Sequence, residues 1–310
     1  MDIKQKIFDL KVKKNITILA HYYQADEIQE VADFIGDSLE LSRMAQSTTS
    51  KIIAFCGVKF MAETAKILNP SKIVILPDIN AGCSLEQSCR PKEFAAFREK
   101  NKDAVAITYI NCSAEIKALS DIICTSSNAE KIINSIPQDR QIIFAPDKNL
   151  GKYLEKQTGR KMILWDGACI VHETFSAKEL TKLKVRHPQA LTMAHPECTE
   201  NLLSEADHVG STSRLLSLVS SLKDVKKFII LTEPGILYKM KQKRPDATFI
   251  TVPGSQKDSP DCINCNNCPF MKLNTLESLY TSMLNLEPQI DLSPELISAA
   301  SKSLLKMLEI

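Results

Sequence analysis

Short apolar runs alternate with longer amphipathic stretches along most of this chain. Between the runs, apolar residues recur at the spacing of helices, as over residues 28–35 and 61–68. Continuous apolar strands that alternate with helices are typical of parallel sheets covered on both faces. The runs that we predict to be buried strands are residues 16–20, 51–55, 73–76, 104–108, 141–144, 162–165, 190–194, 228–231 and 247–252.

One polar pattern follows the first strand of each of three segments, at a spacing of about 87 residues. Two polar residues, two positions apart, are followed by further polar residues at plus twelve and plus seventeen. The three sets are His21, Tyr23, Asp33 and Ser38; Tyr109, Asn111, Asp121 and Ser126; and His195, Glu197, Asp207 and Thr212. A repeat of this length indicates a whole copied domain rather than a short solenoid unit. The copies differ in their chemistry, as expected of a site built by pseudo-threefold symmetry.

We therefore predict an α/β protein of three similar three-layer α/β/α domains with short parallel sheets, arranged with pseudo-threefold symmetry around a central active site. Ligands of open parallel sheets bind beyond the carboxyl ends of the strands. The three polar pairs should therefore face one cavity. The expected domains are residues 1–86, 87–172 and 173–272, with a helical tail, 273–310, that packs on the body.

The later positions of the pattern have a structural and a functional interpretation. Its three hydroxyl residues stand just before helical segments, where such a residue is usually an N-cap. Three helix N-termini at one cavity would equally offer N–H groups and positive dipole ends to an anion. The turn at residues 210–213 is the best candidate for that role. The three aspartates are expected inside helices, as structural residues.

One cysteine-bearing loop per segment accompanies the pattern. Cys83 and Cys169 follow the last strands of the first two segments, 62 and 60 residues beyond the first polar position. In the third segment that distance falls at Ser255, and the loop continues into a run of Cys262, Cys265 and Cys268. Such thiolates suit an iron–sulfur cluster or zinc. If each domain gives one cysteine, a [4Fe–4S] cluster keeps an open iron, which is a Lewis acid for a substrate hydroxyl or carboxylate.

Proton donors and acceptors surround the same predicted centre, and they are His21, Tyr23, Tyr109, His195 and Glu197. His172, three residues after Cys169, is a candidate either for a supporting role or for contact with substrate. The other five cysteines are expected to be buried as small apolar residues.

Composition narrows the classes of function. The 310 residues are 44% hydrophobic and 25% charged, as in soluble globular proteins, and the net charge of +2 gives no reason to expect a nucleic acid or an anionic membrane as partner. No leader and no apolar run near the roughly 18 residues of a membrane span is found, so we expect a cytoplasmic protein. Dinucleotide-binding, Walker A and His-Glu-x-x-His motifs are missing from the sequence, which disfavours nucleotide use.

A set of short motifs in this order resembles the quinolinate synthase family over essentially the whole chain. The motifs occupy residues 21–24, 36–38, 81–84, 109–111, 167–173, 195–198, 210–213, 268–271 and 274–276. The resemblance implies three α/β/α domains around one [4Fe–4S] cluster. It also implies a transferase of NAD biosynthesis that condenses iminoaspartate (iminosuccinate) with dihydroxyacetone phosphate to quinolinate, phosphate and two waters, with possible functional coupling to L-aspartate oxidase.

The resemblance also implies roles for single residues. The implied cluster ligands are Cys83, Cys169 and Cys268, which would leave Cys262 and Cys265 to form a reversible disulfide or to be silent. The implied catalytic residues are Tyr23, His21 and Glu197. The implied substrate-binding residues are His21, Ser38, Tyr109, Asn111, Ser126, His195, Glu197 and Thr212.

Two other classes of protein stay open from the residues alone. A [4Fe–4S] hydro-lyase that acts on a different hydroxy acid would use the same open iron. A redox sensor or electron carrier would use the cysteine run with a fourth protein ligand, and it would leave the three polar sets without a role.

Overall fold

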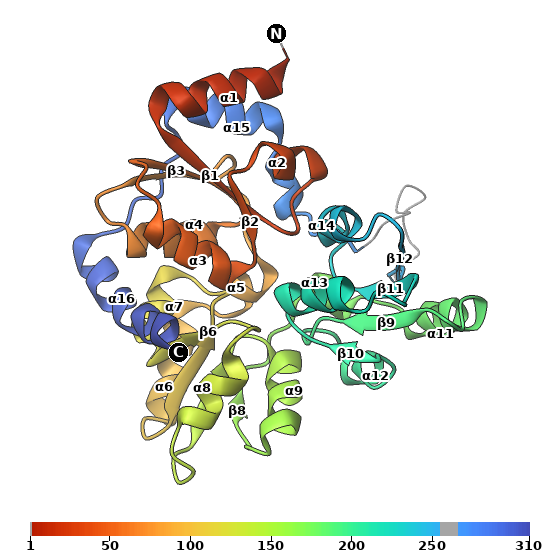
Figure 1. Ribbon diagram of the computed structural model, residues 1–310. Coiled ribbons are helices and arrows are strands. Elements are labelled where there is room, and N and C mark those ends of the chain that lie inside the picture. Colours follow the sequence, from red (N-terminus) through yellow and green to blue (C-terminus); the bar gives the residue numbers. More distant parts are fainter. Residues whose placement is uncertain (1, 255–265) are drawn as a thin grey trace.

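Three four-stranded, all-parallel sheets surround a common centre in this protein (Figure 1). The structure is a computed structural model that describes residues 2–254 and 266–310. The strand orders are β2-β1-β3-β4, β6-β5-β7-β8 and β10-β9-β11-β12, which is one topology repeated three times. Helices flank each sheet, so the predicted three-domain α/β/α fold is confirmed. Each sheet lies inside one of the expected domain ranges, whose limits stay a prediction.

The strands follow the apolar runs closely. The first sheet is formed by β1 (Ile16–His21), β2 (Phe34–Gly36), β3 (Ile52–Cys56) and β4 (Ile73–Ile75). The second is formed by β5 (Val105–Tyr109), β6 (Ile122–Cys124), β7 (Ile142–Ala145) and β8 (Ile163–Leu164). The third is formed by β9 (Leu191–Ala194), β10 (His208–Val209), β11 (Lys227–Leu231) and β12 (Thr248–Thr251).

The helices connect and cover these strands. Those around the first sheet are α1 (Ile3–Lys14), α2 (Asp26–Val31), α3 (Ser38–Ser47) and α4 (Lys59–Leu68). The next are α5 (Ser84–Ser88), α6 (Pro91–Lys100), α7 (Ala114–Leu119), α8 (Ala129–Ser135) and α9 (Lys148–Thr158). The third group is α10 (Ile170–Glu173), α11 (Ala177–Arg186), α12 (Glu200–Leu203), α13 (Thr212–Ser221) and α14 (Ile236–Lys243). The 3-10 turn η1 (Met271–Leu273) leads into the tail, which contains α15 (Leu276–Asn285) and α16 (Pro294–Glu309).

The edge strands β2, β6 and β10 correct the sequence prediction. Helix α2 ends at Val31, so Ile35 lies in β2 and not in a helix. The three aspartates of the pattern, Asp33, Asp121 and Asp207, lie between helix and edge strand and not inside helices. Each carboxylate accepts a hydrogen bond from a central-strand N–H, at 2.8, 2.8 and 2.7 Å, and each backbone N–H donates back to a carbonyl of that strand. The aspartates therefore tie the edge strand to the sheet.

A lysine or arginine side chain stabilises the equivalent helix in each domain, which is the helix before β3, β7 or β11. Lys72 donates to the carbonyl of Thr48 at the end of α3. Arg160 donates to three carbonyls beyond α8, at 2.8, 3.2 and 2.9 Å, and Arg244 donates to four beyond the middle of α13. In each domain one of these acceptors is the C-cap residue of the helix (Thr48, Ile136 or Leu222), whose carbonyl has no partner inside the helix.

We expect Arg160→Met to lower the free energy of unfolding by about 2 kcal/mol, because three carbonyls lose a charged donor and the carbonyl of Ile136 is buried away from water. Urea unfolding followed by circular dichroism would measure the change. Arg90→Met is the matched control, because Arg90 is exposed and its guanidinium has no hydrogen bond in the described chain. Equal stability of the two variants would contradict the role of Arg160.

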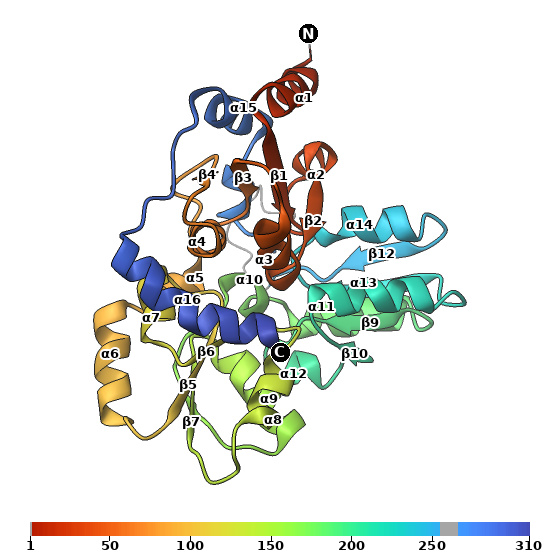
Figure 2. The ribbon, with the colours of Figure 1, turned by 60° about the vertical axis from the view of Figure 1, so that its left-hand side comes forward.

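The tail ties the first two domains together. Helix α15 packs on α1 and β3, and α16 crosses from α4 to α7 and β6 (Figure 2). Between them, Ile290 donates to the carbonyl of Val74, which extends the first sheet beside β4. At the far end, the Ser303 hydroxyl donates to the carbonyl of Lys117 at 2.7 Å. Among the helices described, none combines the length and apolar character that a membrane crossing requires.

Candidate functional site

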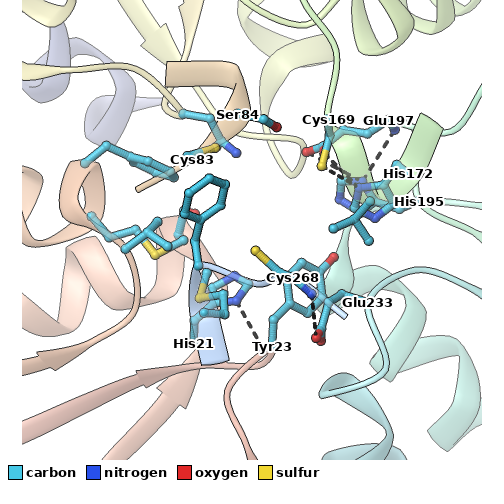
Figure 3. A pocket seen from close by; sticks show the side chains of 18 of the residues that line it. His21, Tyr23, Cys83, Ser84, Cys169, His172, His195, Glu197, Glu233 and Cys268 are labelled. Atoms are coloured by element: carbon cyan, nitrogen blue, oxygen red, sulfur yellow. Dashed lines mark hydrogen bonds and ion pairs between the residues drawn. The ribbon is translucent and has the colours of Figure 1, made fainter. Parts of the chain in front are cut away.

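One pocket lies where the carboxyl ends of the three sheets meet, and Figure 3 shows side chains from all three domains around it. It contains every residue that the sequence analysis assigned to a site. These are His21, Tyr23, Ser38, Cys83, Tyr109, Asn111, Ser126, Cys169, His195, Glu197, Thr212 and Cys268. Side chains from positions as distant as 21 and 268 therefore share one cavity, as the repeat predicted.

Two histidines of the polar pairs use the same local bond. Nδ1 of His21 accepts from the backbone N–H of Tyr23 at 3.1 Å, and Nδ1 of His195 accepts from that of Glu197 at 3.4 Å. The proton of each neutral ring therefore sits on Nε2, which is free to donate. Burial lowers the pKa of His21 to about 4 and that of His195 to about 3. Both rings are thus neutral hydrogen-bond donors near pH 7.

Glu197 is a buried carboxylate at the centre of a hydrogen-bond network. The Tyr109 hydroxyl donates to Oε1 at 2.6 Å, and Nδ1 of His172 lies 2.9 Å from Oε2. Burial alone would raise the pKa of Glu197, but the neighbouring His172 and His195 and the bond from Tyr109 outweigh it and lower the pKa below its usual value. Burial and the charge of Glu197 raise the pKa of Tyr109, which keeps its proton.

The structure places His172 inside the site. Its Nδ1 lies 3.3 Å from the sulfur of Cys169 as well as beside Glu197. Its ring stacks on His195 with 4.8 Å between centroids. His172 therefore connects a cysteine to the carboxylate, and it lines the pocket itself.

Sequence reasoning missed Thr232 and Glu233, which directly follow β11. The Thr232 hydroxyl lies 2.6 Å from the Tyr23 hydroxyl. The Glu233 carboxylate accepts from the Cys268 backbone N–H at 3.3 Å and pairs with Lys272 at 3.0 Å. The repeat drew attention to the first strand of each domain, whereas β11 is the third along the chain. Polar residues directly after the apolar run 228–231 are the signal that could have found them.

A close contact between the first and third domains holds Tyr23 beside Cys268. Lys272, paired with Glu233, donates to the Tyr23 carbonyl at 2.8 Å. Gly235 allows this approach, since a Cβ there would lie 2.6 Å from the carbonyl carbon of Tyr23. The Glu233–Lys272 pair therefore positions the third cysteine relative to Tyr23.

The three cysteines of the pocket have similar surroundings. Cys83 precedes α5, Cys169 precedes α10, and Cys268 lies just before η1. Burial raises the pKa of all three thiols, that of Cys268 to about 11, while backbone N–H groups of the following turn act on each sulfur in the opposite sense. All three are free thiols, and Figure 3 shows their sulfurs around the same hollow. Thiolates with N–H donors suit a cluster ligated through sulfur, so the residues fit the implied cofactor.

The remaining cysteines divide into two groups. Cys262 and Cys265 lie outside the described residues. The other five are at most 1% exposed, as expected of small apolar residues, and they are Cys56, Cys89, Cys112, Cys124 and Cys198.

A second set of metal-ligating atoms overlaps the first. Ligand atoms of Cys169, His172 and Glu197 lie within 4.8 Å of one another. This set could hold a single ion, but it would use the same Cys169 as a three-cysteine cluster.

The hydroxyls of the pattern are not helix caps, contrary to the simpler interpretation. Asp37 caps α3 and Ser211 caps α13, so Ser38 and Thr212 are the first helical residues and face the pocket. Ser126 lies in the turn before α8 and also lines the pocket. In the described chain none of the three hydroxyls has a protein partner, which leaves them available to an anion.

Asp37 joins the three domains beside these hydroxyls. Its Oδ2 accepts from Ser127 and from Ser213, both at 2.8 Å, while its Oδ1 caps α3. Ser211 and Ser213 therefore have protein partners. Of the predicted cradle at residues 210–213, the Thr212 hydroxyl is the one left for a ligand.

Comparison with known proteins agrees with this geometry. The family model described as quinolinate synthetase A protein matches residues 5–309. A quinolinate synthase of Prochlorococcus marinus (strain MIT 9313) is 56% identical over 94% of this chain and 86% of its own length. One of Thermosynechococcus vestitus is 55% identical over 100% of this chain and 95% of its own, and one of Ehrlichia chaffeensis is 57% identical over 98% and 96%.

Proposed function

The chain belongs to the quinolinate synthase family and is an enzyme of that family, and we propose that it condenses iminoaspartate with dihydroxyacetone phosphate to quinolinate, phosphate and two waters, in NAD biosynthesis. The observation that carries the proposal is one pocket in which three free thiols and polar side chains from three domains converge. Such a pocket suits two small anionic substrates and a cluster.

We propose that Cys83, Cys169 and Cys268 hold one [4Fe–4S] cluster. When bound, the cluster would supply an iron without a protein ligand, a Lewis acid that assists the loss of water.

The anionic groups of the substrates have suitable partners on this chain. The hydroxyls of Ser38, Ser126 and Thr212, with the N-termini of α3 and α13, would bind carboxylate or phosphate oxygens. Neutral His21 and His195 would donate from Nε2. The buried Oδ1 of Asn111 has no partner in the described chain, so it would accept from a substrate N–H.

Glu197 and Tyr23 are the residues to which we assign proton transfer. Each loss of water requires one proton to leave a carbon or nitrogen and one to reach the departing hydroxyl. Glu197 is ionised and would act as the base, while Tyr109 holds its other oxygen in place. Burial raises the pKa of Tyr23, so its hydroxyl is protonated and would act as the acid.

The cellular setting follows from the same chemistry. Reduced thiols and a cluster suit the cytoplasm. L-Aspartate oxidase, which would supply iminoaspartate, is the partner enzyme that we propose.

The test is an anaerobic assay of the protein reconstituted with iron and sulfide. With iminoaspartate and dihydroxyacetone phosphate, we expect quinolinate and phosphate in equal amounts, and no product when the triose phosphate is omitted. Dehydration of a hydroxy acid without triose phosphate would instead favour a hydro-lyase. A cluster that only cycles by one electron, without product, would favour an electron carrier.

A further inference from the structure

The carboxylate of Asp37 lies where the three domains meet. Asp37 belongs to the first domain, is 5% exposed and lines the pocket. Its Oδ2 accepts from the Ser127 hydroxyl of the second domain and from the Ser213 hydroxyl of the third, both at 2.8 Å. The two serine oxygens are 3.2 Å apart. One oxygen atom therefore links the first domain to both of the others, and we call these three side chains the Asp37 junction.

Both serine hydroxyls of the Asp37 junction use their protons in these bonds. A hydroxyl has one proton and a carboxylate oxygen has none, so Ser127 and Ser213 are the donors. The Ser211 hydroxyl, 3.1 Å from that of Ser213, then donates to it and accepts from the backbone N–H of Arg214. Neither Ser127 nor Ser213 has a proton left for a substrate anion. Their hydroxyls therefore join domains and do not bind substrate.

Each residue of the Asp37 junction is next in the chain to one of the three hydroxyls that we assign to anion binding. The neighbouring pairs are Asp37 and Ser38, Ser126 and Ser127, and Thr212 and Ser213. The three anion-binding hydroxyls come from three different domains, so no single domain fixes the distances between them. The junction fixes these distances one residue away from each hydroxyl.

We propose that Asp37 is a positioning residue that holds the three anion-binding hydroxyls at the spacing that a substrate anion requires. Its own carboxylate would repel an anion, so it acts through its neighbours and not by contact with substrate. Affinity should depend on the junction, because domains that must be ordered at the moment of binding reduce the free energy of binding. The proposal rests on the proposed function for its kinetic test, but not for its stability test.

The kinetic test removes the two serine hydroxyls and keeps the carboxylate. In the cluster-loaded enzyme, we expect the double variant Ser127→Ala/Ser213→Ala to raise KM for at least one of the two anionic substrates at least about tenfold, with kcat within about threefold of the parent. Ser135→Ala/Ser220→Ala is the matched control. Ser135 lies in α8 and Ser220 in α13, and in the described chain each hydroxyl donates to a carbonyl of its own helix. The KM values of this control should equal those of the parent.

The variant Asp37→Ser separates positioning from charge. Serine is as good an N-cap as aspartate for α3, but its side chain is too short to hold the serines of the other two domains. Loss of the junction should raise KM in this variant, whereas a carboxylate that only repelled the anion would lower KM when it is removed. Two kinetic results would overturn the proposal: a lower KM in Asp37→Ser, or an unchanged KM in Ser127→Ala/Ser213→Ala.

A double-mutant cycle tests the link between domains without any activity. We expect Ser213→Ala to lower the melting temperature of the holoenzyme by about 2 to 4 °C, and by clearly less in the Asp37→Ser background, where the acceptor is already gone. Equal shifts in the two backgrounds would overturn the proposal. A parent that makes no quinolinate would contradict the proposed function instead, and the cycle would still decide whether Asp37 links the domains.

Discussion

Serine at any one of Cys83, Cys169 or Cys268 is expected to remove most of the iron and sulfide from the protein and to abolish quinolinate formation. The three sulfurs reach the pocket from three separate domains, so the loss of one would leave the proposed cluster with two protein ligands. Among the residues described, no further cysteine lines this pocket that could replace the lost one. Iron and acid-labile sulfide per chain, measured after anaerobic reconstitution, would give the result.

Cys262→Ser and Cys265→Ser are the matched controls, and both variants should keep the brown colour of the iron–sulfur cluster. Two other outcomes would each point to a different site. Loss of iron confined to the variants at 262, 265 and 268 would mean that one loop chelates the metal alone. Loss of metal in the Cys169 variant, with metal retained in the Cys83 and Cys268 variants, would favour the overlapping set of Cys169, His172 and Glu197.

The central strands could be predicted because they are buried on both faces. Residues of β1 and β3 are all buried, so their sequences are continuous apolar runs that stand out from the helices. The edge strands have only two or three residues, which is too short to show a period. Residues 28–35 were therefore predicted as a single helix, although the chain leaves the helix after Val31. The backbone bonds made by the aspartates are what define these edges.

The candidate site was predictable where it follows the repeat and hidden where domains meet. His21 and Tyr109 are the last residues of β1 and β5, and His195 directly follows β9, so their convergence follows from the equivalent places of these strands in the three sheets. Thr232 gains its role from contact with Tyr23 of the first domain, and Glu233 from its pair with Lys272, which also donates to the Tyr23 carbonyl of the first domain. Such contacts depend on how domains pack, and no local period in the sequence encodes that.

Duplication also explains how one fold supplies different chemistry at equivalent places. The turn after β1 and the turn after β9 give a histidine the same backbone bond to Nδ1. The second domain has Tyr109 in this place, and its hydroxyl reaches across to Glu197 of the third domain. His21, Tyr109 and His195 thus occupy equivalent backbone positions in the three domains. The difference in chemistry that proton transfer requires comes from their side chains and not from the backbone.

Glu197→Gln is expected to keep the fold and the chromophore but to lower kcat by about 10²- to 10⁴-fold, the usual contribution of a positioned acid or base. The amide matches the carboxylate in shape, but it cannot take a proton. The amide also has only one acceptor oxygen, whereas the two oxygens of the carboxylate accept from Tyr109 and from His172. Steady-state quinolinate formation at saturating substrates, with iron content measured on the same samples, would separate lost turnover from a lost cluster.

Glu200→Gln is the matched control for this prediction. This substitution removes one negative charge three residues later in the chain. Glu200 is exposed in the first turn of α12 and does not line the pocket. Its kcat should equal that of the parent. Undiminished quinolinate formation by Glu197→Gln would remove Glu197 from the mechanism, and the base would then have to be sought among the other pocket residues. A loss in both variants would instead show that overall charge near α12, rather than a proton acceptor at position 197, supports turnover.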